Sequence, residues 1–153
     1  MNRVFLTLAG LVTAAALCFA AAAPSVAEGY GKQKVVYHIN YHGGPELKAY
    51  KGAMRNIQNH INALGAENLE VRVVLHGNGV GLLSGAMDDD GLQTAVASLK
   101  GQNVAFNVCN NTLVGRDIDY NNDLYDVWES DIVASGVAEL AHLQQQGYTY
   151  IKP

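Results

Sequence analysis

The chain has 153 residues, of which 49% are hydrophobic and 16% charged, and its formal net charge is −4. A length of this order fits one domain with a core of ordinary size. The acidic balance, with only scattered lysines, argues against a nucleic-acid partner.

The first 27 residues have the pattern of an export signal. Arg3 precedes an apolar run at residues 4–19, and Ser25, Val26 and Ala27 form a small-x-small cleavage site. We expect cleavage after Ala27, which leaves residues 28–153 as a single domain in the periplasm or otherwise outside the cytoplasm. An uncleaved membrane anchor is the alternative, and no later run is long enough to cross a membrane.

Removal of the signal would leave one cysteine. Cys18 would depart with the apolar run, and because the residue before it is not small, a lipid-modified Cys18 is disfavoured. The remaining thiol, Cys109, then has no partner for an internal disulfide. A lone thiol in an oxidising compartment is expected to be buried, paired between chains or used chemically.

The first half of the domain predicts two strands around one long helix. Residues 34–39 and 69–75 are largely apolar, as expected of strands covered on both faces. Between them, apolar residues recur every three or four positions from Pro45 to Gly65, which suit the start and the cap of a helix. The second strand ends in a glycine-rich turn at residues 76–83.

The second half continues the alternation of helices and strands. Its expected elements are a helix from Asp88 to Gly101, a strand at 103–108, a short helix at 110–115, a long loop at 118–129 with apolar residues that pack on the domain, a strand at 131–133, a helix from Ser135 to Gln146 and a strand at 148–151. This order predicts an α/β fold with a parallel sheet between helical layers.

Cys109 follows the third predicted strand and precedes a helix. Binding groups collect at the carboxyl ends of parallel strands. A helix start offers unpaired N–H groups and the positive end of the helix dipole, both of which favour a thiolate. A buried and chemically inert cysteine is equally compatible with this position.

Two histidines also lie near strand ends. His38 is close to the end of the first strand and His76 follows the second. If the first three strands are neighbours, both histidines share one sheet edge with Cys109. They could then stabilise the thiolate or carry protons, bind copper or zinc together with the thiolate, or simply be satisfied residues at strand ends.

Two other patterns carry less weight. The glycines at 77, 79 and 81 do not have the dinucleotide-binding spacing and follow the second strand, although their backbone amides could hold a small anion. Arg116 could attract an anionic substrate, but a solvent-exposed side chain at the end of a helix is the more ordinary interpretation.

Several stretches resemble one known family. They are VVYHIN at residues 35–40, HGNGVGLL at 76–83, FNVCNNTL followed by Gly115 and Arg116, and the tail SGVAELAHLQQQGYTYIKP at 135–153. Together they are similar to the DsrE/DsrF-like family, also called DsrEFH-like or YchN-like, over essentially the whole chain from Val35 to Pro153.

The resemblance implies a three-layer α/β/α fold with a five-stranded parallel sheet and association into homo-oligomers (trimers or hexamers). We expect no cofactor. In the sulfur-relay branch of the family, a cysteine at the end of the third strand carries a persulfide, and its context matches residues 106–116 here. Cys109 is therefore the one residue to which the resemblance assigns a role, that of the sulfur carrier. From their positions in the sequence, the residues expected to support it are His38, His76, Asn110 and Arg116.

The expected function is thus that of a periplasmic sulfur-handling protein. Its donor would be thiosulfate, polysulfide or a partner's persulfide. The relay proteins of the family work in the cytoplasm, so export requires a donor or reductant in another compartment. Two alternatives stay open: a non-catalytic module that binds a metal or small ligand through His38, His76 and Cys109, and a structural oligomer in which the cysteine is merely packed.

Overall fold

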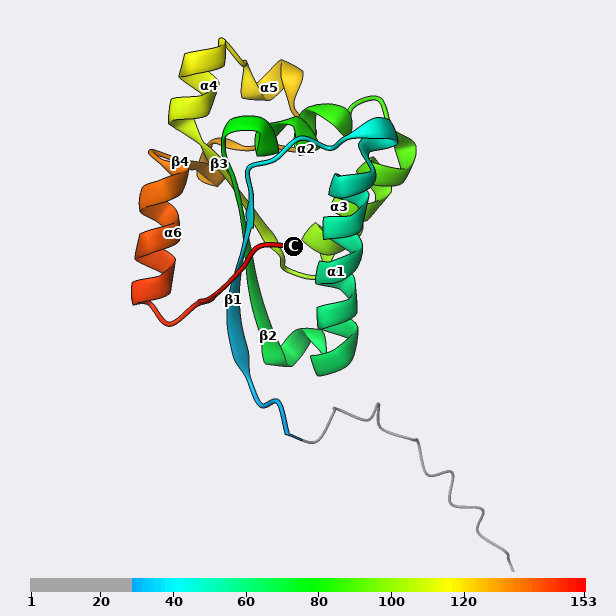
Figure 1. Cartoon of the computed structure of the whole chain (residues 1–153), viewed down its shortest axis with the longest axis vertical. Helices are drawn as coiled ribbons and strands as arrows, with labels where there is room; N and C mark the ends of the chain where they lie inside the picture. Colours follow the sequence, from blue (N-terminus) through cyan, green and yellow to red (C-terminus); the bar gives the residue numbers. More distant parts are fainter. Residues whose placement is uncertain (1–28) are drawn as a thin grey trace, which may run out of the picture.

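Five parallel strands form one sheet between two unequal layers of helices (Figure 1). The computed structural model describes residues 29–153, so the predicted signal segment and its cleavage site lie outside the described residues. The strands are β1 (Gln33–Ile39), β2 (Leu69–Leu75), β3 (Ala105–Cys109), β4 (Ile132–Val133) and β5 (Thr149–Ile151), in the order β4-β3-β2-β1-β5. The predicted α/β fold with a five-stranded parallel sheet is confirmed.

Helices cover both faces of this sheet. The α-helices are α1 (Lys48–Leu64), α2 (Gly81–Gly85), α3 (Asp90–Gly101), α4 (Asn110–Arg116), α5 (Tyr120–Asp123) and α6 (Gly136–Gln145), and short 3-10 turns are η1 (Pro45–Leu47), η2 (Ala66–Asn68), η3 (Gly77–Val80) and η4 (Glu129–Asp131). In Figure 1, α1 and α3 lie on one side of the sheet, α6 lies on the other, and α4 and α5 stand above the carboxyl ends of the strands. No helix within residues 29–153 has the length and apolar character needed to span a bilayer.

The two faces of the sheet differ in what they bury. Alternate strand residues, such as Tyr37, Ile39 and Val73, belong to the large core on the side of α1 and α3. The side of α6 has a small core, formed by Val36, Val74, Leu140, Leu143 and Tyr148. Because burying one such side chain contributes roughly 1.5–3 kcal/mol, the large core supplies most of the hydrophobic stabilisation. The α6 side can therefore hold polar groups near the strand ends.

The first long helix begins later than predicted. Pro45–Leu47 is a separate 3-10 turn, because Glu46 and Leu47 have left-handed backbone angles, with φ of 53° and 54°. The regular helix α1 then runs from Lys48 to Leu64. Gly65, with φ of 84°, ends it as predicted, since this conformation favours glycine.

The glycine-rich segment at 76–83 is helical rather than an open turn. It forms the 3-10 turn η3 and runs directly into α2. A Cβ atom on Gly79 would lie 1.9 Å from the carbonyl oxygen of Ile39, so the backbone of this segment packs against the end of β1. Close backbone packing thus explains this glycine without a nucleotide ligand.

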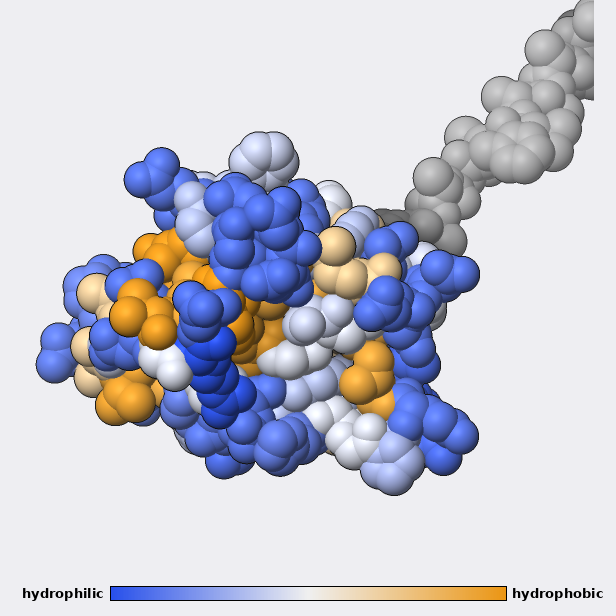
Figure 2. Space-filling model, turned by 90° about the horizontal axis from the view of Figure 1, so that it is seen from above, coloured by the Kyte–Doolittle hydropathy of each residue, from blue (hydrophilic) through white to orange (hydrophobic). Residues whose placement is uncertain are grey.

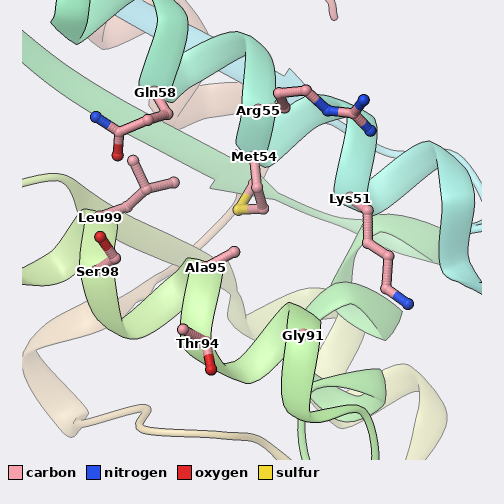
Figure 3. A pocket seen from close by; sticks show the side chains of 9 residues that line it. All are labelled: Lys51, Met54, Arg55, Gln58, Gly91, Thr94, Ala95, Ser98 and Leu99. Carbon is pink, nitrogen blue, oxygen red and sulfur yellow. The ribbon is translucent and has the colours of Figure 1, made fainter.

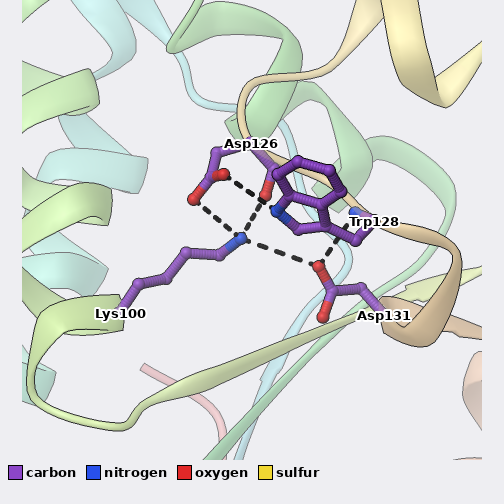
Figure 4. A network of polar contacts seen from close by, with 4 residues as sticks. All are labelled: Lys100, Asp126, Trp128 and Asp131. Atoms are coloured by element: carbon purple, nitrogen blue, oxygen red, sulfur yellow. Dashed lines mark hydrogen bonds and ion pairs between the residues drawn. The ribbon is translucent and has the colours of Figure 1, made fainter.

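The long loop predicted at 118–129 contains the short helix α5, and it packs on the domain as expected through Leu124 and Val127, which are buried. Trp128 was also expected to pack but is 66% exposed. The segment is instead held by Lys100, whose Nζ lies 3.1 Å from Asp126 Oδ2 and 3.6 Å from Asp131 Oδ2 (Figure 4). Trp128 Nε1 donates to Asp126 Oδ1 at 3.1 Å, so the indole lies over this polar network.

Candidate functional site

The carboxyl ends of β1, β2 and β3 bring the predicted site residues to one place. Leu75 of β2 pairs with Val108 of β3, so the next residues along the two strands, His76 and Cys109, are neighbours. His38 lies on β1 beside Val74. The strand alternation turns these three side chains toward α6, away from the large core, and the predicted clustering is therefore present.

Cys109 is only 5% exposed, yet polar groups surround its sulfur. Burial raises the pKa of the Cys109 thiol, but hydrogen bonds from the Gly136 N–H, from the Thr112 hydroxyl and backbone, and from the Asn111 N–H outweigh that effect. The pKa of the thiol consequently lies below its ordinary value. Such N–H and O–H donors stabilise the anion directly.

The donors come from the starts of two helices. Cys109 is the residue that precedes α4, and Asn111 and Thr112 belong to its first turn. Gly136 is the first residue of α6, whose preceding Ser135 caps the helix by accepting from the Ala138 N–H at 3.4 Å. The sequence predicted the contribution of α4. The second helix start became visible only in the fold, where α6 packs across β3.

His38 and His76 form a hydrogen-bonded pair. Their Nε2 atoms are 2.7 Å apart, and the ring centroids are 4.7 Å apart with an angle of 23° between the planes. His38 Nδ1 lies 2.7 Å from the Tyr150 hydroxyl oxygen. One imidazole therefore donates an N–H to the other, and Tyr150 completes a continuous chain of hydrogen bonds.

Both imidazoles favour the neutral form. Burial, followed by the positive charges of His76 and Lys152, lowers the pKa of His38 to about 4. Burial and then Lys152 also lower the pKa of His76. At neutral pH the pair is uncharged, so it does not act as an imidazolium partner for the thiolate.

The structure does not assemble the predicted three-ligand metal site of His38, His76 and Cys109 within the described residues. Within residues 29–153, no group of three or more histidine, cysteine, aspartate or glutamate side chains is arranged to hold a metal ion. The structure offers the two imidazoles of His38 and His76 as candidate ligands, and their Nε2 atoms are hydrogen-bonded to each other.

The two remaining predicted residues lie at the margin of the site. Asn110 is the exposed first residue of α4, and the N–H groups that reach the sulfur come from the two residues after it. Arg116 donates from Nη2 to Asn78 Oδ1 at 2.8 Å. Together with the Gly77 N–H, which donates to Thr112 Oγ1 at 2.9 Å, this contact fastens the glycine-rich segment to α4.

Sequence reasoning missed Tyr150, Gly136 and Asn107. The first two reach the site only because β5 pairs with β1 and α6 crosses the sheet. Asn107 precedes Cys109 by two positions, so it points to the same side of β3, and its buried Oδ1 has no hydrogen-bond partner within the described residues. An unsatisfied buried acceptor of this kind is unusual in folded proteins.

The surface around the strand ends is mixed in polarity. Figure 2, seen from above, looks onto this end of the molecule and shows hydrophobic surface gathered on the left, the side on which α4 and α6 lie in Figure 1. Val114 on α4 and Val137 on α6 are 74% and 65% exposed. Apolar side chains thus stand on the two helices whose first turns hold the sulfur.

A separate groove of about 560 Å³ lies between α1 and α3 (Figure 3). Met54 and Leu99 lie at its base, and Lys51 and Arg55 extend from α1 beside it. None of the predicted site residues lines this groove. It belongs to the helical layer on the opposite face of the sheet from Cys109, so it is separate from the site at the strand ends.

These observations define a class of protein: a parallel α/β domain that presents a polarised thiol at the carboxyl edge of its sheet. The model of the DsrE/DsrF-like family matches residues 34–153, and the chain belongs to this family. The match covers the whole described domain except its first few residues.

A solved structure supports the same assignment. The chain is 32% identical to the protein of unknown function MTH1491 from Methanobacterium thermoautotrophicum, with a TM-score of 0.65. The similarity covers 80% of this chain and 100% of that one. No curated protein is significantly similar to the chain.

Proposed function

We propose that this protein handles sulfur outside the cytoplasm and that Cys109 carries sulfane sulfur as a persulfide. The observation that supports the proposal most strongly is the set of hydrogen-bond donors around the Cys109 sulfur, which lowers the pKa of the thiol despite its burial. A packed, inert cysteine has no need of such donors, because burial in apolar surroundings would keep it protonated.

The chemistry requires only a nucleophilic thiolate and a sulfane donor. With thiosulfate, the Cys109 thiolate attacks the outer sulfur, a new S–S bond forms, and the bond between the two thiosulfate sulfurs breaks. Sulfite leaves with the electron pair, and the cysteine is left as a persulfide anion. The N–H groups of Gly136 and Asn111 stabilise the negative charge of the attacking thiolate.

Access to the sulfur favours small donors. Since Cys109 is 5% exposed, thiosulfate or polysulfide can approach it more easily than the thiol of a folded partner.

We also propose that the chain forms a homo-oligomer, the trimer or hexamer that its family suggests. The exposed Val114 and Val137 beside the site are apolar surface that an assembly or a sulfur acceptor would cover.

Mass spectrometry tests the persulfide directly. The mature protein, reduced and then incubated with thiosulfate or polysulfide, should gain one sulfur atom, about 32 Da, on the peptide that contains Cys109. The gain should disappear after treatment with a reductant and should not form on Cys109→Ser. A wild-type protein that gains no sulfur from either donor, while its thiol still reacts with iodoacetamide, would refute the proposal.

A metal-binding function is the second candidate, since the Nε2 atoms of His38 and His76 lie side by side with a thiol on the neighbouring strand. Copper or zinc retained at one per chain after gel filtration, and lost in His38→Gln, would favour it. In that case the sulfur gain on Cys109 should be absent from the metal-loaded protein.

A further inference from the structure

We propose that the hydrogen-bonded chain of Tyr150, His38 and His76 is a positioning device that holds the Gly136 N–H on the Cys109 sulfur. These three residues would then control the nucleophilicity of the thiol without touching the substrate. The inference rests on the proposed use of Cys109 as a working thiol, and it assigns to the imidazoles a role other than acid–base catalysis.

The chain begins at an exposed residue and ends beside the cysteine. Tyr150, which is 41% exposed, contacts His38 Nδ1, and His38 Nε2 contacts His76 Nε2, both at 2.7 Å. His38 is 8% exposed. The rings of His38 and His76 also stack on each other. The two hydrogen bonds and this ring contact together restrict the orientation of the His76 side chain.

His76 in turn packs on Gly136. A Cβ atom at Gly136 would lie 2.9 Å from His76 Cβ and 3.2 Å from its Cγ and Cδ2. Real Cβ atoms essentially never approach within 3.0 Å, so only glycine allows α6 to begin this close to the imidazole. The same residue donates its N–H to the Cys109 sulfur, and it is the largest of the contributions that lower the pKa of the thiol.

Burial and a neighbouring cation favour the neutral form of both imidazoles. Lys152, which directly follows β5, is the positively charged group that acts on both imidazoles, and the Tyr150 hydroxyl contacts His38. Arg116 lies at the end of α4 and Glu139 in the first turn of α6. Lys152 disfavours protonation of both imidazoles, which burial already disfavours. The route that we assign to the pair is therefore the close contact of His76 with Gly136.

Single substitutions in the hydrogen-bonded series Tyr150–His38–His76 test this role. Tyr150→Phe keeps the ring and removes the hydroxyl, and His76→Ala removes the imidazole that packs on Gly136. The matched control is His60→Gln, because His60 makes a similar contact, 2.9 Å from the Tyr37 hydroxyl, on α1 and away from the thiol. All three should keep the circular dichroism spectrum of the wild type.

The measurement is the rate of Cys109 alkylation by iodoacetamide between pH 5 and 10, without any sulfur donor. Loss of a hydrogen bond to an anion should raise the pKa of the thiol by about one unit in His76→Ala, so the pH at which alkylation reaches half of its plateau rate should rise by the same amount. Tyr150→Phe should give a smaller rise in the same direction. The rate plateau at high pH separately reports any change in access to the sulfur.

A folded His76→Ala variant with an unchanged pKa of Cys109 would overturn the inference, as would an equal shift in His60→Gln. The amide signal of Gly136 provides a second readout: in wild type it should move as Cys109 titrates, and in His76→Ala this movement should be lost. Because neither measurement uses a donor, a shifted pKa in a protein that forms no persulfide would refute the proposed function and leave this inference standing.

Discussion

Replacing Gly79 by alanine should destabilise the domain more than any other single methyl addition in the glycine-rich segment. The added Cβ would lie 1.9 Å from the Ile39 carbonyl oxygen and 2.5 Å from its carbonyl carbon, where real contacts stay above 3.0 Å. The two backbone segments would have to separate by about 1 Å, and neither is a flexible side-chain end. Overpacking of a well-packed core costs roughly 1–3 kcal/mol, and we expect Gly79→Ala at or above the upper end of that range.

Urea denaturation of the purified variant measures this cost. With a urea dependence of about 1–3 kcal/mol per molar for a domain of this size, a loss of ~3 kcal/mol lowers the midpoint by roughly 1–3 M. Gly52→Ala is the matched control, because a Cβ at this position inside α1 meets nothing within 4 Å. It should raise stability by up to ~1 kcal/mol through helix propensity. A Gly79→Ala midpoint within error of wild type would refute the packing argument.

Three further predictions concern stability. Lys100→Met should loosen the segment around Trp128, because Asp126 and Asp131 lose their shared cation; hydrogen exchange in residues 126–131 should become faster, with the core strands unchanged. Asn107→Val should stabilise the domain by about 1 kcal/mol, since it removes a buried acceptor without a partner; a lower denaturation midpoint would contradict this. His38, whose pKa in the fold is about 4 against an ordinary 6.5, binds its proton more readily when unfolded. Folding stability should therefore fall as the pH drops from 6.5 toward 4, and this slope should be shallower in His38→Gln when midpoints are compared at pH 7 and pH 5.

Much of the fold could be predicted because its elements have clear periodicity. The strand at 69–75 and the cap at Gly65 were placed correctly, since an apolar run and a glycine after a helical stripe are local signals. The start of α1 was misplaced by three residues because proline suits either kind of first turn, and the left-handed angles of Glu46 and Leu47 have no signature in the sequence.

The candidate site was predictable to the extent that parallel strands collect residues at one edge. His38, His76 and Cys109 follow from the positions of strand ends alone. Their contacts do not, because they depend on which strands are neighbours and on where α6 crosses the sheet. Tyr150 contacts His38 only because β5 pairs with β1, although the two are more than a hundred positions apart in sequence.

The way in which the site stabilises the Cys109 thiolate determines how that stabilisation depends on pH. A thiolate paired with an imidazolium loses its partner when the pH rises above the pKa of the histidine. The N–H groups of Gly136 and Asn111 do not titrate, so the stabilisation they provide persists over the whole range in which the fold is intact. For a protein that we propose works outside the cytoplasm, where the pH follows the surroundings, neutral donors held by two helix starts are better suited to a persulfide carrier than a charged partner.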